Sequence, residues 1–477
     1  MAQTVTELTA DYLIVGSGAV GMAFADVIVA ESNASVVLVD RFAKPGGHWN
    51  VAYPFVTLHQ PSQFYGVSSK ELSRGVVDEV GWNEGLNDLA SGAEILAYFD
   101  DVMRHTLLPS GQVEYFPMCE YRGDGNFTHK LSGDSFHVTA GTVVDCTWLN
   151  TTVPSTHTPN FTVADGVWFM PLNDLPTITE APERYVVVGG GKTGIDAILW
   201  LLEHHVTPDD ITWVVSRDAW MLNRKNTQPG DEFFFDTIGA QANQFEAIAN
   251  ADSIPDMFDR LEDCGYFLRL DRDHRPSMFH GATISEMELE QLRRVSNVVR
   301  MGHVQSITTD EIVFADGSLP TTTKDVFVDC SATAIMNLEI KPVFEDRLIT
   351  PQMVRGYQPV FSAALIAHLE LTRDSVDDKN ALCQVLPMPN RDIDFLRLTS
   401  RFMVNQYNWG QDPDLRTWLL ENRLDGFSQM VANVQPHEHD KRAVLNKLSS
   451  NAFPAVAKLE QFIAEYDAEN EAENAGG

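Results

Sequence analysis

An α/β fold is predicted by three features of this 477-residue sequence. The pattern G-x-G-x-x-G occurs twice, at residues 16–21 and 189–194. Each copy follows a short apolar run typical of a buried parallel strand and precedes an apolar stretch with helical spacing. After about residue 390 the apolar spacing is mostly helical. These features indicate two Rossmann-like dinucleotide-binding units and a helical C-terminal region, in a chain too long for one hydrophobic core.

The composition excludes several classes of partner. The net charge of −33 disfavours nucleic acid and anionic membranes. The five cysteines are scattered without a C-x-x-C pair, as is typical of a reducing cytosol. Neither a signal peptide nor an apolar run of about 20 residues is recognisable. We therefore expect a cytoplasmic protein that binds no nucleic acid and no membrane. His437 and His439 fit an exposed polar loop better than a metal site, so no metal is expected.

The first glycine motif is expected to bind a dinucleotide at the start of a helix. Gly16 makes the tight turn, Gly18 lets the backbone approach a pyrophosphate, and Gly21 lets the helix pack on the strand. Free N–H groups at the helix N-terminus would hold the pyrophosphate. The next predicted strand ends at Asp40, whose carboxylate can accept both hydroxyls of an unmodified ribose. The adjoining residues assigned to this cofactor site are Ala19, Val20 and Arg41.

The second glycine motif has the letters of a phosphate-binding P-loop but not its spacing. A P-loop requires a further glycine five positions before Gly191, where this chain has Val186. The pattern that remains is a second dinucleotide turn, which follows an apolar run and opens onto an apolar helix. The residues assigned to it are Gly189, Gly191, Lys192, Thr193 and Gly194.

The strand after the second motif ends without an acidic residue. Ser216 and Arg217 stand where the first unit has Asp40, and Arg224 and Lys225 follow and would add positive charge. A guanidinium pairs with a ribose 2′-phosphate, which a carboxylate would repel. The second site is therefore expected to bind NADPH. The alternative is that Arg217 is a solvated residue at the strand end and that NADH is used.

The segment after Asp40 contains a third set of motifs. It reads Gly46-Gly47-x-Trp49, then Tyr53-Pro54, then LHQPSQFYGVSS. This order resembles the class B flavin-dependent monooxygenases, which include flavin-containing, Baeyer–Villiger and N-hydroxylating enzymes. The resemblance implies FAD in the first unit and NADPH in the second, with Gly47, His48 and Trp49 beside the flavin. A plain core role for Trp49 is the alternative.

The resemblance also implies that the second Rossmann-like domain is inserted into the first. The aromatic-rich insertion at 218–300 has two interpretations: it lines a substrate channel, or it is simply packing. The expected division is an FAD-binding domain at 1–165, an NADPH-binding domain at 166–330 with the helical insertion 218–300, a return to the FAD-binding domain at 331–395, and a helical C-terminal region with an acidic tail at 396–477.

Two positions depart from the family pattern. His59 stands where many flavin-containing monooxygenases have the Asn of Thr-Asn-x-Pro. We assign His59 and Gln60 as catalytic groups at the flavin edge, because either side chain can donate a hydrogen bond there. Ordering of a loop is the alternative role for His59. The Baeyer–Villiger motif Phe-x-Gly-x-x-x-His is not intact, since VWFMPLNDLP contains Asn173 and no His.

The expected function is that of an FAD- and NADPH-dependent monooxygenase. The resemblance implies that a peroxide formed at the flavin C4a position transfers one oxygen atom from O₂ to a small organic substrate. The type of oxygenation stays open, and so does assembly into a homo-oligomer. Two alternatives remain: a flavin-dependent reductase or dehydrogenase that inserts no oxygen, and a non-enzymatic flavoprotein with a vestigial second site.

Overall fold

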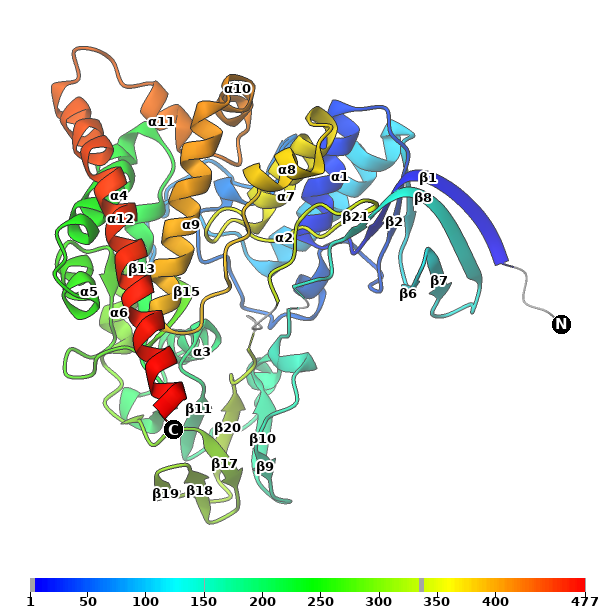
Figure 1. The fold of residues 1–477 in the computed structure, drawn as a ribbon. Coiled ribbons are helices and arrows are strands. Elements are labelled where there is room, and N and C mark those ends of the chain that lie inside the picture. The colour runs from blue at the N-terminus through cyan, green and yellow to red at the C-terminus, as the bar shows by residue number, and fades with distance from the viewer. Residues whose placement is uncertain (1–4, 150, 334–338, 477) are drawn as a thin grey trace.

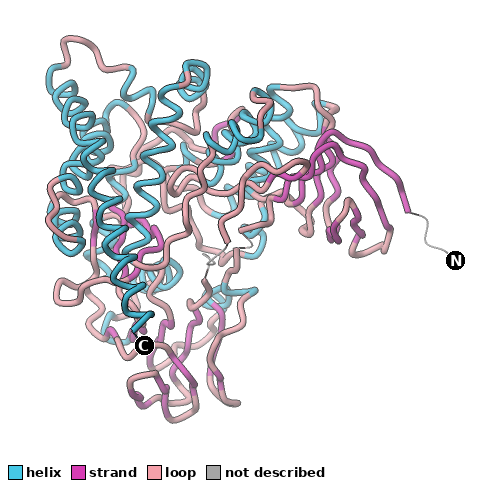
Figure 2. The backbone as a smooth tube through the Cα atoms, in the orientation of Figure 1, coloured by secondary structure: helices cyan, strands magenta, loops and turns pink. Residues whose placement is uncertain are grey.

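The computed structural model describes residues 5–149, 151–333 and 339–476, which form an α/β fold with two parallel-rich sheets (Figure 1). Residues 334–338 and 477, which belong to the third and fourth expected segments, lie outside the described part of the chain. Figure 2 shows the strands gathered in separate regions, with helices filling the space beside them.

The first sheet contains the first glycine motif. Its strand order is β5-β2-β1-β8-β7-β6, with β21 paired to β8. The strands β1, β2, β5, β8 and β21 run parallel, whereas β6 and β7 add an antiparallel hairpin. The bounds are β1 Val5–Val15, β2 Val36–Val39, β5 Val113–Phe116, β6 Cys119–Gly123, β7 Asn126–His129, β8 Ser135–Asp145 and β21 Leu348–Ile349.

Helices α1 (Ala19–Glu31) and α7 (Pro359–Thr372) pack against each other beside this sheet. All residues of α1 from Gly21 to Ile28 are buried. Apart from Asp26, whose carboxylate accepts from the N–H and hydroxyl of Ser69, this stretch is apolar, and such a helix is expected between a sheet and a second helix. The return of the chain through β21 and α7 therefore completes the core of the first unit.

The second sheet is entirely parallel and lies, in sequence, between β8 and β21 of the first sheet. Its order is β10-β20-β11-β12-β16, and the second glycine motif follows β11. The predicted fold class, with the second Rossmann-like unit inserted into the first, is confirmed. The bounds are β10 Trp168–Pro171, β11 Arg184–Val188, β12 Ile211–Val214, β16 Val298–Val299 and β20 Asp325–Asp329.

The region predicted as a helical insertion contains helices and also a small sheet. The helices are α4 (Phe234–Ala249), α5 (Ile254–Asp263) and α6 (Glu286–Leu292). Three strands accompany them, in the order β14-β13-β15: β13 Ala219–Asn223, β14 Phe267–Leu268 and β15 Met278–Ile284.

The described residues from 392 to 476 form four helices, as the apolar spacing predicts. They are α9 Asp392–Gln411, α10 Pro413–Glu421, α11 Ser428–Ala432 and α12 His439–Gly476. Helix α12 runs beside α4 and α9 (Figure 1). Phe258 and Phe267 of the insertion share one buried cluster with Phe395 of α9 and Leu459 of α12. The insertion and the C-terminal helices are therefore joined by a common core.

The domain boundaries in the expected division stay predictions. No helix in the described ranges is both long enough and apolar enough to cross a lipid bilayer.

Candidate nucleotide-binding site

The second glycine motif forms a tight turn between β11 and helix α3 (Lys192–Glu203). A Cβ atom on Gly194 would overlap the carbonyl oxygen of Gly189, so the strand and helix pack this closely only with glycine there. A Cβ atom on Gly191 would meet nothing within 4 Å. Among the described residues, no side chain caps the start of α3. Its free N–H groups are therefore able to bind an anion.

This turn borders a large cleft with a cavity volume of about 830 Å³. Gly189, Gly191, Lys192 and Thr193 line one side. The 48–65 segment of the first unit lines another side, with four of the predicted residues: His48, Trp49, His59 and Gln60. The structure thus brings the second glycine turn and the flavin-edge candidates to one cavity, although they lie more than 120 positions apart in sequence.

Ser216 and Arg217 line the same cleft, just after the end of β12. The Nη2 atom of Arg217 donates to Oδ1 of Asn390 at 2.9 Å, and the Nε atom has no hydrogen-bond partner among the described residues. A ring nitrogen of His280 lies 3.0 Å from the same Asn390 oxygen. Asn390 therefore holds the guanidinium at the edge of the cleft through one of its terminal nitrogens, while the unpartnered Nε atom is buried.

A polar chain crosses the cleft from the second unit to the first. Lys192 forms an ion pair with Asp196 one turn further along α3. The hydroxyl of Tyr53 donates to the other oxygen of Asp196 at 2.6 Å. Tyr53 lies in the segment after the Gly-Gly-x-Trp motif, so this chain fixes the N-terminus of α3 against the first unit.

Burial changes the protonation of two histidines in the cleft. Burial lowers the pKa of His48 to about 4. Burial, followed by the nearby charges of Lys192 and Arg224, lowers the pKa of His59 well below its usual 6.5. Both imidazoles are therefore neutral at neutral pH, and each can donate one hydrogen bond and accept another.

The first glycine motif lies apart from the residues that line the cleft. Gly21 packs as Gly194 does, since a Cβ atom there would overlap the carbonyl oxygen of Gly16. No side chain caps the start of α1, where Gly18 is followed by Ala19 and Val20. These three residues are half-buried, so the start of this helix is partly exposed. The structure leaves an anion cradle at this turn as well.

Gly47 explains why the Gly-Gly-x-Trp motif needs its glycines. The N–H of Gly46 donates to the carbonyl of Ser17 at 2.8 Å. A Cβ atom on Gly47 would lie 2.9 Å from the Cα atom of Gly18, and the φ of Gly47 is +56°. A side chain at this position would therefore press against the first glycine turn.

Asp40 is buried beside this turn, and local groups already hold its carboxylate. Oδ2 accepts from the N–H of Ser17 at 2.5 Å and from its hydroxyl at 2.8 Å, and Oδ1 accepts from the N–H of Phe42 at 2.7 Å. Burial raises the pKa of this carboxyl, and the hydrogen bonds act against that rise. The neighbouring Arg41 is exposed and stacks over Phe42. Acceptance of ribose hydroxyls by Asp40 stays a prediction.

No protein-family model matches the sequence. Two proteins described only as uncharacterized, Rv2000 of Mycobacterium tuberculosis and Mb2023 of Mycobacterium bovis, are each 47% identical to this chain over 456 residues. Each alignment covers 94% of this chain and 84% of the mycobacterial protein. The chain belongs to the family of these mycobacterial proteins.

Solved structures similar to this family member across most of the chain include flavin-containing and Baeyer–Villiger monooxygenases. A flavin-containing monooxygenase from Stenotrophomonas maltophilia is 14% identical, with a TM-score of 0.43, and the match covers 79% of this chain and 99% of that one. OTEMO in complex with FAD and NADP is 14% identical, with a TM-score of 0.47, and the match covers 76% of this chain and 83% of that one. Cyclohexanone-bound cyclohexanone monooxygenase is 14% identical, with a TM-score of 0.42, and the match covers 96% of this chain and 98% of that one.

Arg224 and Lys225, which follow Arg217 in sequence, are not among the residues that line the cleft. Arg224 is fully buried, pairs with Glu288 at 2.8 Å, and donates to the carbonyl of His59 at 2.8 Å. Lys225 pairs with Asp236 at 3.1 Å. Arg224 therefore fixes the His59 loop to the insertion.

Asn173 also has a structural contact. Its Nδ2 atom donates to the carbonyl of Val51 at 3.1 Å, next to the Gly-Gly-x-Trp turn. Two cleft residues, Tyr357 and Gln358, were missed by sequence reasoning. They precede α7 in a loop whose sequence has no motif, so no local signal points to them.

Proposed function

We propose that this protein is an FAD- and NADPH-dependent monooxygenase that transfers one oxygen atom from O₂ to a small organic substrate. One observation carries the proposal: the second glycine turn and the His48–Gln60 segment face the same cavity of about 830 Å³. A reaction that joins two dinucleotides requires their reactive rings to meet in a shared space. That arrangement favours electron transfer between two bound cofactors over two independent nucleotide sites.

The residues of the second unit fit NADPH. The uncapped N-terminus of α3 and the open face of Gly191 suit a pyrophosphate. Arg217 has free donors at the cleft edge and Ser216 lies beside it, which suits a 2′-phosphate. Asn390 would act as the positioning residue for Arg217.

The residues of the first unit fit the pyrophosphate of FAD. The uncapped, accessible start of α1 suits its charge, and Gly18 provides a surface without a side chain. Asp40 has one acceptor position left on Oδ1, so it can take one ribose hydroxyl directly. A second hydroxyl would have to displace the hydroxyl of Ser17 from Oδ2.

When bound, FAD would supply the redox and oxygen chemistry, and NADPH the reducing equivalents. The neutral imidazole of His59 would hold a hydrogen bond at the ring edge without adding charge there. Gln60 would provide a second, uncharged donor. Trp49 is fixed by a 2.7 Å hydrogen bond from Nε1 to the hydroxyl of Tyr65 and would exclude water from one wall.

A stopped-flow experiment tests oxygenation. Protein loaded with FAD is reduced with NADPH and then mixed with O₂ in the presence of NADP⁺. A long-lived transient that absorbs in the near ultraviolet is expected for a monooxygenase. Direct return to the oxidised flavin spectrum would instead support a reductase that inserts no oxygen.

A further inference from the structure

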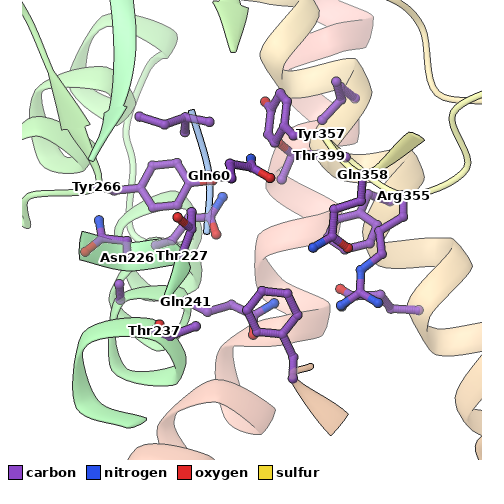
Figure 3. A pocket seen from close by; sticks show the side chains of 18 of the residues that line it. Gln60, Asn226, Thr227, Thr237, Gln241, Tyr266, Arg355, Tyr357, Gln358 and Thr399 are labelled. Carbon is purple, nitrogen blue, oxygen red and sulfur yellow. The ribbon is translucent and has the colours of Figure 1, made fainter. Parts of the chain in front are cut away.

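A second, smaller cavity adjoins the nucleotide cleft. Its volume is about 140 Å³, and it lies between the insertion and the C-terminal helices. Figure 3 shows polar side chains that reach it from both sides, including Asn226, Thr227 and Gln241 from the insertion and Thr399 from α9. Apolar cavities of about 150 Å³ are large enough to hold benzene. This inner pocket therefore has room for one small ring.

No described residue brings an unpaired charge to the inner pocket, although the chain has a net charge of −33. Arg355 is the one charged residue among those that line it. Its guanidinium forms a buried ion pair with Asp425 and stacks over the rings of Phe361 and Phe427. The remaining polar groups are amides and hydroxyls. A charged ligand would lose its hydration here without gaining an ionic partner.

Two residues that line this pocket each have a polar atom without a partner among the described residues. These atoms are the hydroxyl of Tyr357 and Oε1 of Gln358, and both are buried. Buried polar atoms without partners are rare in folded proteins. Burial raises the pKa of the Tyr357 hydroxyl well above its usual value, so this group stays protonated and can donate. The pair therefore offers one donor and one amide group to a ligand.

Tyr357 lies at the junction of the two cavities. It lines both of them, as do Gln60, Phe64 and Gln358. A molecule in the inner pocket would therefore reach the flavin-edge candidates past Gln60. Figure 3 shows Gln60 between Tyr266 of the insertion and Tyr357.

The backbone of Tyr357 is strained. Its φ is +61°, in the left-handed region that bulky side chains rarely adopt. The ring packs edge-to-face on Phe279 and against Gly281, where a Cβ atom would overlap it. Strain of this kind persists where the surroundings impose it, which is frequent at ligand sites.

We propose that the inner pocket binds the organic substrate, and that this substrate is a neutral molecule of about one six-membered ring with a carbonyl, hydroxyl or amide group, held by Tyr357 and Gln358. The proposal rests on the proposed function, because only that function calls for an organic substrate beside the cofactors. The proposal goes beyond the proposed function by naming the pocket that binds the substrate and the chemical class of that substrate.

Calorimetric titration with matched probes tests the charge requirement. Benzamide, benzyl alcohol and acetophenone are the neutral probes, and benzoate and benzylammonium are their charged counterparts. The neutral probes are expected to bind FAD-loaded protein at least about tenfold more tightly than the charged ones, a difference of about 1.4 kcal/mol. Equal affinity for a charged probe, or no binding of any neutral probe, would overturn the proposal.

Two variants test the location. Tyr357→Phe should weaken benzamide binding about three- to tenfold, as loss of one hydrogen bond predicts. It should leave the melting temperature unchanged or higher, since the hydroxyl has no protein partner to lose. Gln241→Trp should fill the pocket from α4 and abolish binding. Tyr407→Phe, on the exposed side of α9, is the control that should change neither quantity.

Unchanged benzamide affinity in Tyr357→Phe would contradict the assignment of that residue. Reduction of FAD by NADPH without any probe, followed at 450 nm, tests the proposed function separately. Cofactor reduction without probe binding would overturn the inner pocket alone. Absence of cofactor reduction would overturn the proposed function, while the titrations would still decide whether the pocket binds neutral molecules.

Discussion

Under the proposed function, Arg217 is the side chain that would select NADPH over NADH. It has one hydrogen bond to Asn390, a free Nε atom, and a position on the cleft wall at the end of β12. No carboxylate in the described part of the chain pairs with this guanidinium, so its remaining donors are available to a phosphate. The same strand end in the first unit has Asp40, which would repel a phosphate.

The Arg217→Ala variant should therefore raise the KM for NADPH by about 10- to 100-fold, because charge-assisted hydrogen bonds contribute about 1.5–3 kcal/mol. The KM for NADH should change by less than about threefold, since NADH has no 2′-phosphate. Steady-state kinetics with both cofactors measure this contrast. Equal increases would contradict the assignment of NADPH to the second site.

Protonation of His48 should make the free energy of unfolding depend on pH. Burial lowers the pKa of His48 from 6.5 to about 4, so the unfolded chain binds more protons than the folded chain between these values. The contribution of neutral, buried His48 to the free energy of unfolding is fully present above pH 6.5. It is lost as the pH falls toward 4. Between about pH 7 and about pH 5, this effect should lower the free energy of unfolding by about 2 kcal/mol.

Urea unfolding of the cofactor-free protein at the two pH values measures this effect. The His48→Gln variant should lose about 2 kcal/mol less than the wild type over the same pH range. His59 and His280, whose pKa values are also lowered by burial, remain in both proteins and cancel in the comparison. An identical pH dependence would show that His48 is not buried as a neutral ring.

At the scale of elements, the two strand–turn–helix units could be predicted from sequence because their signals are local. Glycine spacing and the flanking apolar runs act within about 30 residues, and both turns have the predicted form. The strand β13 and the buried position of Arg224 could not be predicted, because both depend on contacts with distant segments such as β15 and Glu288. The same applies to Tyr357, whose conformation depends on Phe279 and Gly281.

A pair of glycine variants separates stability from binding in the second unit. Gly194→Ala should destabilise the protein, because the new Cβ atom would overlap the carbonyl oxygen of Gly189. Gly191→Ala should leave the melting temperature nearly unchanged, since its Cβ atom would point into open space and its φ of −87° suits alanine. It should nevertheless weaken NADPH binding at least about tenfold, a loss of about 1.4 kcal/mol.

Thermal unfolding and NADPH titration measure the two quantities. Gly191→Ala with unaltered NADPH affinity would show that the open face of Gly191 does not contact the pyrophosphate. An equal fall in melting temperature for both variants would contradict the conclusion that only position 194 lacks room for a Cβ atom.

At the scale of the whole molecule, the insertion and the C-terminal helices form a third packed region beside the two Rossmann-like units. They share one aromatic core and enclose the inner pocket beside the cleft. The sequence left open whether the aromatic residues of 218–300 line a channel or pack. Phe258 and Phe267 pack, whereas Phe245 and Tyr266 also line the inner pocket. The cleft therefore has the second glycine turn on one side and the smaller cavity on another.

The most direct test of the account is anaerobic reduction of the bound flavin by NADPH. The purified protein, incubated with FAD and freed of excess cofactor, should stay yellow and lose its absorbance near 450 nm when NADPH is added. A colourless protein that takes up no FAD, or a bound flavin that NADPH leaves oxidised, would contradict the proposal that this protein binds both cofactors and passes electrons from NADPH to FAD.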